Sequence, residues 1–224
     1  YVPSDEYVPD GEPHVFNGRV YVYGSHDRFN APIFCVNDYV CWSAPVEDLS
    51  EWRYEGVIYR KKQDPKNPLG YHLLFAPDVC QGPDGRYYLY YAFDFLGIMS
   101  VAVCDTPAGE YKFLGHIHYA DGTLWGRRRG DQLPFDPGVL LDDDGRVWLY
   151  SGFYNAVPAI LTGGHKLRCD GGTVLELEKD MVTIKTEPRV IFPKKGPGAF
   201  QGHEFFEASS IRKEGKTYIF VYSS

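Results

Sequence analysis

The sequence has little of what marks membrane, nucleic-acid-binding or disulfide-stabilised proteins. No apolar run in its 224 residues approaches the roughly 18 that a membrane-spanning helix needs. Positive charge is also short, because the formal net charge is −7 and the basic residues are scattered apart from 127–129, which we expect to form a solvated loop. Since binding to a nucleic-acid backbone needs a basic patch, we expect no nucleic-acid partner and no membrane.

Cysteine is scarce as well. The five cysteines are Cys35, Cys41, Cys80, Cys104 and Cys169. An odd number at irregular spacing is a poor disulfide framework, and none has a metal-binding Cys-x-x-Cys spacing. Together with the lack of a signal peptide, this favours the cytoplasm; if Tyr1 follows a processed leader, a secreted or periplasmic location is the alternative. Nothing in the sequence defines an oligomeric state.

Long helical periodicity is absent too, whereas aromatic residues, glycine and proline are abundant. Aromatics make up 16% of the chain, with 24 Gly and 16 Pro. This composition favours many short strands and tight turns, so we expect an all-β protein.

A short pattern recurs four times: an acidic or amide residue, then Gly, a basic residue and an alternating apolar strand. The four copies are 17–23, 84–90, 144–150 and 214–220. Their spacing of roughly 60 to 70 residues suits the four-stranded blades of a β-propeller. Three units are nearly complete and the fourth stops at Ser224. We therefore expect residues 1–224 to form one propeller domain of about three and a half blades, truncated at its C-terminal end.

One carboxylate precedes the first strand of each unit, seven to nine residues ahead of the turn glycine. These carboxylates are Asp10, Asp78, Asp136 and Glu207. Equivalent spacing indicates equivalent positions at one end of the innermost strands, so we expect the four to converge in one axial pocket. A pocket with several carboxylates and aromatic walls suits hydrolysis of a glycosidic bond, which needs one acid and one base.

Three motifs carry a family resemblance. The stretch from Asp10 to Tyr21, the Phe75-Ala76-Pro77-Asp78 run and the Phe206-Glu207-Ala208-Ser209 run occur in the order found in glycoside hydrolase family 43, which this chain resembles over nearly its whole length. The resemblance implies a five-bladed propeller and an inverting mechanism. It also implies that Asp10 is the general base, that Glu207 is the general acid, and that Asp78 raises the pKa of Glu207 and orients it.

The base assignment has an alternative. The family usually has Pro directly after the base, whereas Gly11-Glu12-Pro13 follows Asp10, so an alignment on Glu12-Pro13 would make Glu12 the base. We favour Asp10, because its spacing to Gly18 fits the other three units. Inversion further predicts that the acid and base carboxyl groups lie roughly 6.5 to 9.5 Å apart.

Other residues are candidates for supporting roles. We expect Phe34, Trp42, Phe75, His26 and Asp136 to bind substrate, with Asp136 in the floor of the pocket. No cofactor is required, although the family resemblance allows a structural ion in the propeller channel, near His203 or His165. The expected substrates are oligo- or polysaccharides with α-L-arabinofuranosyl or β-D-xylosyl linkages, from plant hemicellulose or pectin. An endo-acting arabinanase and a carbohydrate-binding propeller without catalysis are the alternatives.

Overall fold

The structure is a computed structural model that describes residues 3–224, and it is built almost entirely from β-strands. The helical element of this part of the chain is one 3₁₀ turn, η1 (Lys61–Gln63). No helix among the described residues is long and apolar enough to cross a membrane.

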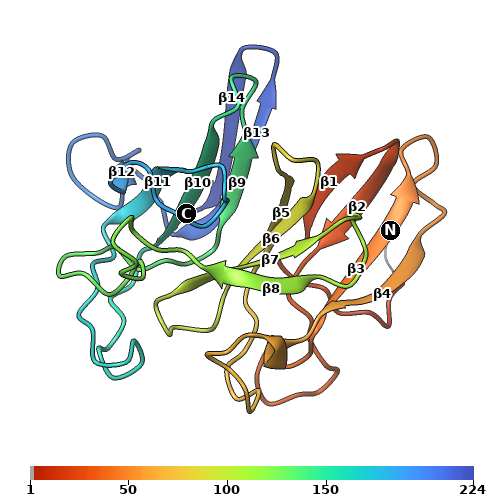
Figure 1. Cartoon of the computed structure of the whole chain (residues 1–224), viewed down its shortest axis with the longest axis horizontal. Helices are drawn as coiled ribbons and strands as arrows, with labels where there is room; N and C mark the ends of the chain where they lie inside the picture. Colours follow the sequence, from red (N-terminus) through yellow and green to blue (C-terminus); the bar gives the residue numbers. More distant parts are fainter. Residues whose placement is uncertain (1–2) are drawn as a thin grey trace.

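Three four-stranded antiparallel sheets and one hairpin follow one another along the chain (Figure 1). The first sheet holds β1 (Glu12–Phe16), β2 (Arg19–Tyr23), β3 (Tyr39–Pro45) and β4 (Arg53–Tyr59). The second holds β5 (Asp78–Gln81), β6 (Tyr87–Ala92), β7 (Met99–Cys104) and β8 (Lys112–His116). The third holds β9 (Gly138–Leu141), β10 (Val147–Phe153), β11 (Gly171–Leu177) and β12 (Arg189–Pro193), and the hairpin holds β13 (Glu207–Glu214) and β14 (Thr217–Ser223).

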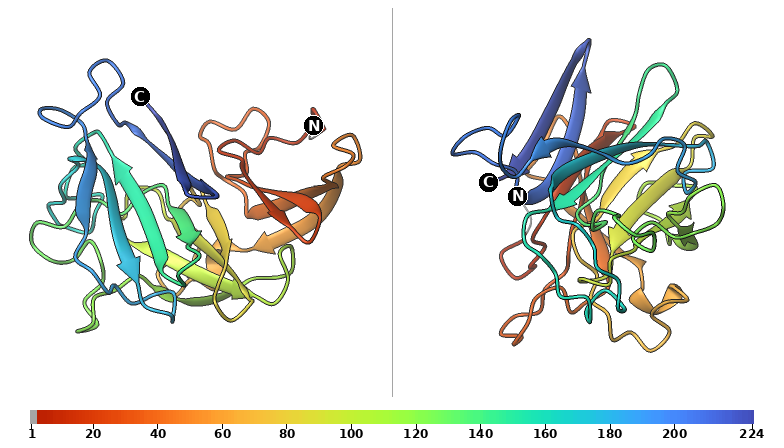
Figure 2. Two further views of the ribbon diagram at one scale, coloured as in Figure 1. Left: turned by 90° about the horizontal axis from the view of Figure 1, so that it is seen from above. Right: turned by 90° about the vertical axis from the view of Figure 1, so that its left-hand side faces the viewer.

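Within each sheet the strands pair in sequence order, as in a propeller blade. The sheets follow an arc, with β1–β4 at one end and the β13–β14 hairpin toward the other (Figure 2). This arrangement confirms the prediction of an all-β propeller with about three and a half blades. Each predicted repeat forms the turn and second strand of a blade, because its Gly adopts the positive φ that the tight turn requires.

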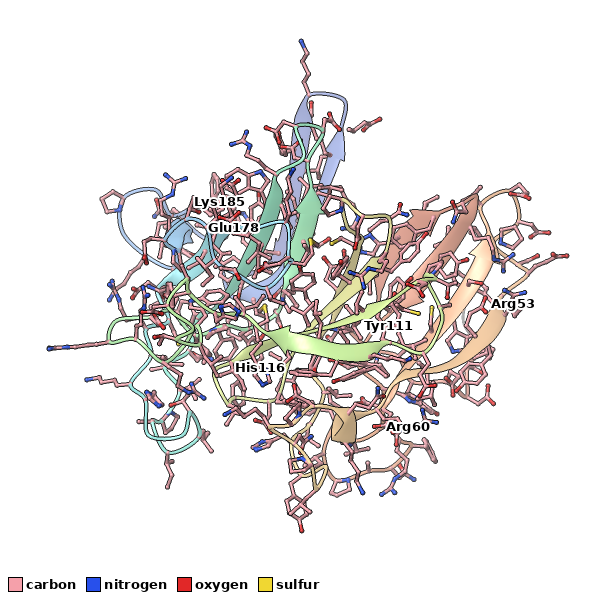
Figure 3. All side chains as sticks on the ribbon, viewed as in Figure 1. Arg53, Arg60, Tyr111, His116, Glu178 and Lys185 are labelled. Carbon is pink, nitrogen blue, oxygen red and sulfur yellow. The ribbon has the colours of Figure 1, made fainter. Side chains whose placement is uncertain are left out.

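The core lies between neighbouring blades. One buried cluster joins blades 1 and 2 and includes Tyr23 and Leu89, and a second joins blades 2 and 3 and includes Tyr90 and Leu149. Tyr111, labelled beside β8 in Figure 3, is buried, and its N–H donates to the carbonyl of Ile58 at the end of the first blade. The blades are therefore fixed relative to one another, and so are the ends of their inner strands.

The five cysteines all lie within the described residues, and all are free thiols. The expectation that they form no disulfide framework is therefore confirmed.

Candidate active site

A cavity of about 330 Å³ opens where the inner strands of the blades begin. Four carboxylates border it: Asp10, Asp27, Asp136 and Glu207. Its walls are aromatic, formed by Phe34, Phe75, Phe95, Phe135, Phe153 and Phe206. A second hollow of about 420 Å³ continues from it and shares Asp10, Ala76, Asp136 and Glu207. Acidic groups against an apolar wall suit a ligand that offers both hydroxyl groups and flat hydrophobic faces, as a sugar does.

Asp10 lies two residues before β1, with a positive φ of 55°. Its Oδ2 accepts a hydrogen bond of 2.8 Å from the hydroxyl of Ser25, a fully buried residue at the end of the same blade's second strand. One carboxylate oxygen is thus held by the protein, and the residue is exposed to the cavity.

Asp136 lies two residues before β9 and also has a positive φ, of 46°. Its Oδ2 accepts a hydrogen bond of 3.1 Å from the N–H of Ala208 in the next blade. Burial raises the pKa of Asp136 well above its ordinary value, and the charges of Glu207 and Asp10 raise it further against the effect of that N–H. Asp136 therefore favours its neutral form.

Glu207 begins β13 and is half-buried. Burial raises the pKa of Glu207, and the negative charge of Asp10 adds to this. Glu207 in turn adds to the upward shift of the pKa of Asp136, so the two carboxyl groups interact.

Backbone strain gathers at this cavity. Eight non-glycine residues of the described chain have positive φ, and four of them are Asp10, Cys35, Asp136 and Ala208. A left-handed conformation costs roughly 1 to 3 kcal/mol at such residues and is often found at functional sites. A β-bulge between Glu207 and Ser210 adds a local kink at the same place.

Asp78 does not lie where the sequence suggested. Its fully buried carboxylate accepts hydrogen bonds from the N–H groups of Val79 (2.7 Å) and Val139 (2.6 Å), and it contacts His14 Nε2 at 2.6 Å. Asp78 lines neither of the two hollows, and the pKa of Glu207 is raised by burial and Asp10 instead. The expected contact between Asp78 and Glu207 is thus corrected: Asp78 lies inside β5, and Asp136 takes the place beside Glu207.

Glu12, the alternative base, lies within β1. Its Oε1 accepts hydrogen bonds from the Ser210 hydroxyl (2.7 Å) and from the guanidinium of Arg212. Glu12 borders the second hollow but is absent from the lining of the aromatic cavity, where Asp10 lies. The geometry therefore favours Asp10 over Glu12.

The predicted substrate-binding residues divide into two groups. Phe34, Phe75 and Asp136 line the aromatic cavity. Trp42 and His26 do not: Trp42 donates from Nε1 to Glu6 at 3.1 Å, and His26 is bonded through Nδ1 to the carbonyl of Asp38 at 3.0 Å. These two side chains form hydrogen bonds within the first blade and do not line the cavity.

We expected a channel ion near His203 or His165, but the candidate metal ligands in the structure are other residues. Within residues 3–224, the group of His, Cys, Asp and Glu side chains close enough to share a metal ion is Glu12, His14 and Asp78. Arg212 already contacts Glu12, and backbone N–H groups already bond Asp78. Two of the three candidate ligands therefore already have partners within the protein.

Sequence reasoning missed several residues of the cavity. Asp27 comes from the loop between β2 and β3, where its Oδ1 accepts the N–H of Cys35 at 2.5 Å. Phe95, Phe135 and Phe153 come from three different segments, and they stack or tilt against one another with ring centroids 4.8 to 5.6 Å apart. The position of Phe135 directly before Asp136 was the available signal for one of them.

The fold and this cavity define the class of the protein: a β-propeller with an acidic, aromatic-walled cavity where its inner strands begin. Its family follows from sequence comparison, because residues 9–224 match the glycosyl hydrolases family 43, and the chain belongs to that family.

Relatives with curated names agree. A xylosidase/arabinosidase of Thermoclostridium stercorarium is 60% identical over 228 residues, which cover all of this chain and 46% of that protein. Xylosidase/arabinosidase 43A of Humicola insolens is 31% identical, over 97% of this chain and 72% of that protein. The chain thus spans about half the length of the first of these relatives.

Solved structures share the fold. A family 43 β-xylosidase/α-arabinofuranosidase from a compost metagenome, solved with xylotriose in a calcium-free form, superposes with a TM-score of 0.71. It is 27% identical, over 99% of this chain and 71% of that one.

Proposed function

We propose that this protein is an inverting glycoside hydrolase that cleaves α-L-arabinofuranosyl or β-D-xylosyl linkages. Asp10 is the general base, Glu207 the general acid, and Asp136 the group that tunes the pKa of the acid. The observation that carries the proposal is that one aromatic cavity brings these three carboxylates together from blades 1, 3 and 4. The names of the relatives support the substrate class.

Glu207 and Asp10 have different chemical roles. Glu207, whose pKa is raised, retains a proton that it can give to the leaving glycosidic oxygen. Asp10, held at Oδ2 by Ser25, accepts a proton from the water that attacks the anomeric carbon from the opposite face. The proton from Glu207 neutralises the leaving oxygen, and the proton taken by Asp10 comes from the water as its oxygen bonds to the anomeric carbon.

Asp136 acts through Glu207. Its buried carboxyl opposes a second negative charge next to the acid, so the Asp136–Glu207 pair keeps a proton at higher pH than either group would alone. The N–H of Ala208, the residue after Glu207, binds Asp136 and ties the two groups together. The aromatic walls supply flat surfaces against which a sugar ring packs.

The test uses nitrophenyl α-L-arabinofuranoside and nitrophenyl β-D-xyloside with the full chain and its variants. We expect Asp10→Asn and Glu207→Gln each to lower kcat by at least 10²-fold. Glu204→Gln is the matched control, because Glu204 is an acid three residues from Glu207 that lines neither hollow. NMR of the first product formed should show the inverted anomer.

Three outcomes contradict parts of the proposal. A full rate in Asp10→Asn rules out Asp10 as the base and makes Glu12 the next candidate. A product of retained configuration rules out inversion. Binding of xylan or arabinan oligomers without any cleavage supports a carbohydrate-binding propeller, and cleavage of internal arabinan bonds alone supports an endo-acting arabinanase.

A further inference from the structure

Below the carboxylates of the cavity, a hydrogen-bonded bridge crosses from blade 1 to blade 4. Glu12 of β1 accepts hydrogen bonds from Ser210 at 2.7 Å and from the guanidinium of Arg212, both on β13. Arg212 also donates at 2.7 Å to the carbonyl of Pro13, the next residue of β1. Side chain and backbone of one strand are therefore both held by the other strand.

This bridge connects two strands that do not pair. In the described chain β1 pairs with β2 and β13 pairs with β14, and the two hairpins belong to separate sheets. Side chains rather than a backbone ladder therefore tie these strands together. Within one blade, backbone hydrogen bonds fix the distance between neighbouring strands. Between β1 and β13 this distance depends on the side chains of the bridge instead.

The two strands carry the two ends of the reaction. Asp10 lies two residues before Glu12, and Glu207 lies three residues before Ser210. Both Asp10 and Ala208 have positive φ, and a β-bulge lies between Glu207 and Ser210, so the backbone that presents the carboxylates is irregular. Each carboxylate therefore lies within three residues of a residue of the bridge.

We propose that Glu12 and Arg212 are positioning residues that set the separation between the base Asp10 and the acid Glu207. This inference rests on the proposed function of those two carboxylates. An inverting reaction needs room for one water molecule between base and sugar, and a misplacement of about 1 Å costs roughly 10²-fold in rate. The ion pair is partly buried, with side-chain exposures of 17% for Glu12 and 36% for Arg212.

Arg212→Met is the main variant, because it removes the guanidinium and keeps an unbranched apolar side chain close in size to the aliphatic part of arginine. We expect kcat for nitrophenyl xyloside or arabinofuranoside to fall roughly 10- to 100-fold, with KM changed less than about threefold. Glu12→Gln, which keeps an oxygen for Ser210, should lose less. The double variant Glu12→Gln/Arg212→Met should lose no more than Arg212→Met alone, because both changes break one bridge.

Lys213→Met is the matched control for a purely structural effect. Lys213 is the next residue of β13 and forms ion pairs with Asp142 and Asp143 outside the cavity. It should lower the melting temperature without the selective loss of kcat. Exchange of the bridge charges in Glu12→Arg/Arg212→Glu should restore part of the rate.

Two results overturn the inference: an unchanged kcat in Arg212→Met, or an equal loss of kcat in Lys213→Met. Should Arg212→Met fail to fold, Glu12→Gln decides, and its unchanged kcat equally rejects the proposal. If Asp10→Asn and Glu207→Gln are inactive while the bridge variants are fully active, only the positioning role fails. If Asp10→Asn keeps the full rate, Asp10 is not the base, and the proposed function is rejected before the positioning role is tested.

Discussion

The entrances of blades 2 and 3 look alike in sequence but perform different tasks. Blade 2 enters through Ala76-Pro77-Asp78 and blade 3 through Asp136-Pro137-Gly138. In the ladder Asp78 pairs with Tyr90 and Gly138 pairs with Tyr150, and each tyrosine is the fifth residue after its turn glycine. Asp78 therefore corresponds to Gly138, and Asp136 corresponds to Ala76.

Two positions follow from this alignment: an outer one, before the strand, and an inner one, two residues later on the same face. Asp10 and Asp136 occupy the outer position and border the cavity, whereas Glu12 and Asp78 occupy the inner position and bond to neighbouring blades. A shift of two residues thus decides whether a carboxylate borders the aromatic cavity or forms hydrogen bonds to another blade.

The largest expected effect concerns catalysis. Asp136→Asn should lower kcat/KM by roughly 10²- to 10⁴-fold, because it removes the carboxyl group next to the general acid. Asp78→Asn, the same change at the inner position, should lower it less than tenfold when assayed well below its melting temperature. Initial rates with nitrophenyl xyloside measure both, and equal losses would abolish the distinction between the two positions.

The second expected effect is on stability, and it concerns the inner position rather than the outer one. Asp78→Ala removes the acceptor for two backbone N–H groups and for His14, all in a buried site. Leaving such donors unpaired costs about 1 to 3 kcal/mol each, so we expect a loss of at least about 3 kcal/mol in the free energy of unfolding. Urea denaturation monitored by tryptophan fluorescence measures it. A loss below 1 kcal/mol would show that Asp78 does not fasten the blades.

The repeats allowed the fold to be predicted from sequence, because the turn glycines need positive φ wherever they occur and the strands beside them alternate. The family resemblance added the proposed roles of Asp10 as base and Glu207 as acid. Distance from the turn glycine was a less accurate guide: Gly85 comes seven residues after Asp78 and Gly145 nine after Asp136. The predicted range of seven to nine residues therefore includes both the inner and the outer position.

Blade 1 shows why a count alone misleads. Its turn is the two-residue Asn17-Gly18, whereas three residues form the turns of blades 2 and 3, where Gly82 pairs with Arg86 and Asp142 with Arg146. Asp10, eight residues before Gly18, is therefore outer, and Glu12 is inner. The loop residues Asp27 and Phe95, and Phe153 at the end of β10, were missed for another reason: tertiary packing alone brings them to the cavity.

Ala76 occupies the outer position of blade 2, and a substitution there can introduce a third outer carboxylate. Ala76 borders both hollows together with Asp136 and Glu207, so Ala76→Asp adds a negative charge beside the acid. This charge should raise the pKa of Glu207 and move the basic limb of the kcat/KM profile to higher pH, by about one unit. Ala76→Asn, equal in size but neutral, should leave that limb in place. An unmoved limb in Ala76→Asp would place residue 76 too far from the acid.

The smallest expected effect is a gain in stability from Asp136→Asn. Because burial raises the pKa of Asp136 in the folded state, the unfolded chain releases this proton at lower pH and is favoured as pH rises from the ordinary value toward the folded one. Asparagine cannot ionise, so the variant should gain stability over wild type above about pH 4, increasingly so as pH rises toward the raised pKa of Asp136, and melt roughly 2 to 4 °C higher per kcal/mol gained. Asp144→Asn is the control of opposite sign, because a hydrogen bond from Arg146 lowers the pKa of Asp144.

Scanning calorimetry at pH 4 and pH 8 measures the difference. A gain at pH 4 as large as at pH 8 would mean that the outer carboxylate is not held neutral by burial.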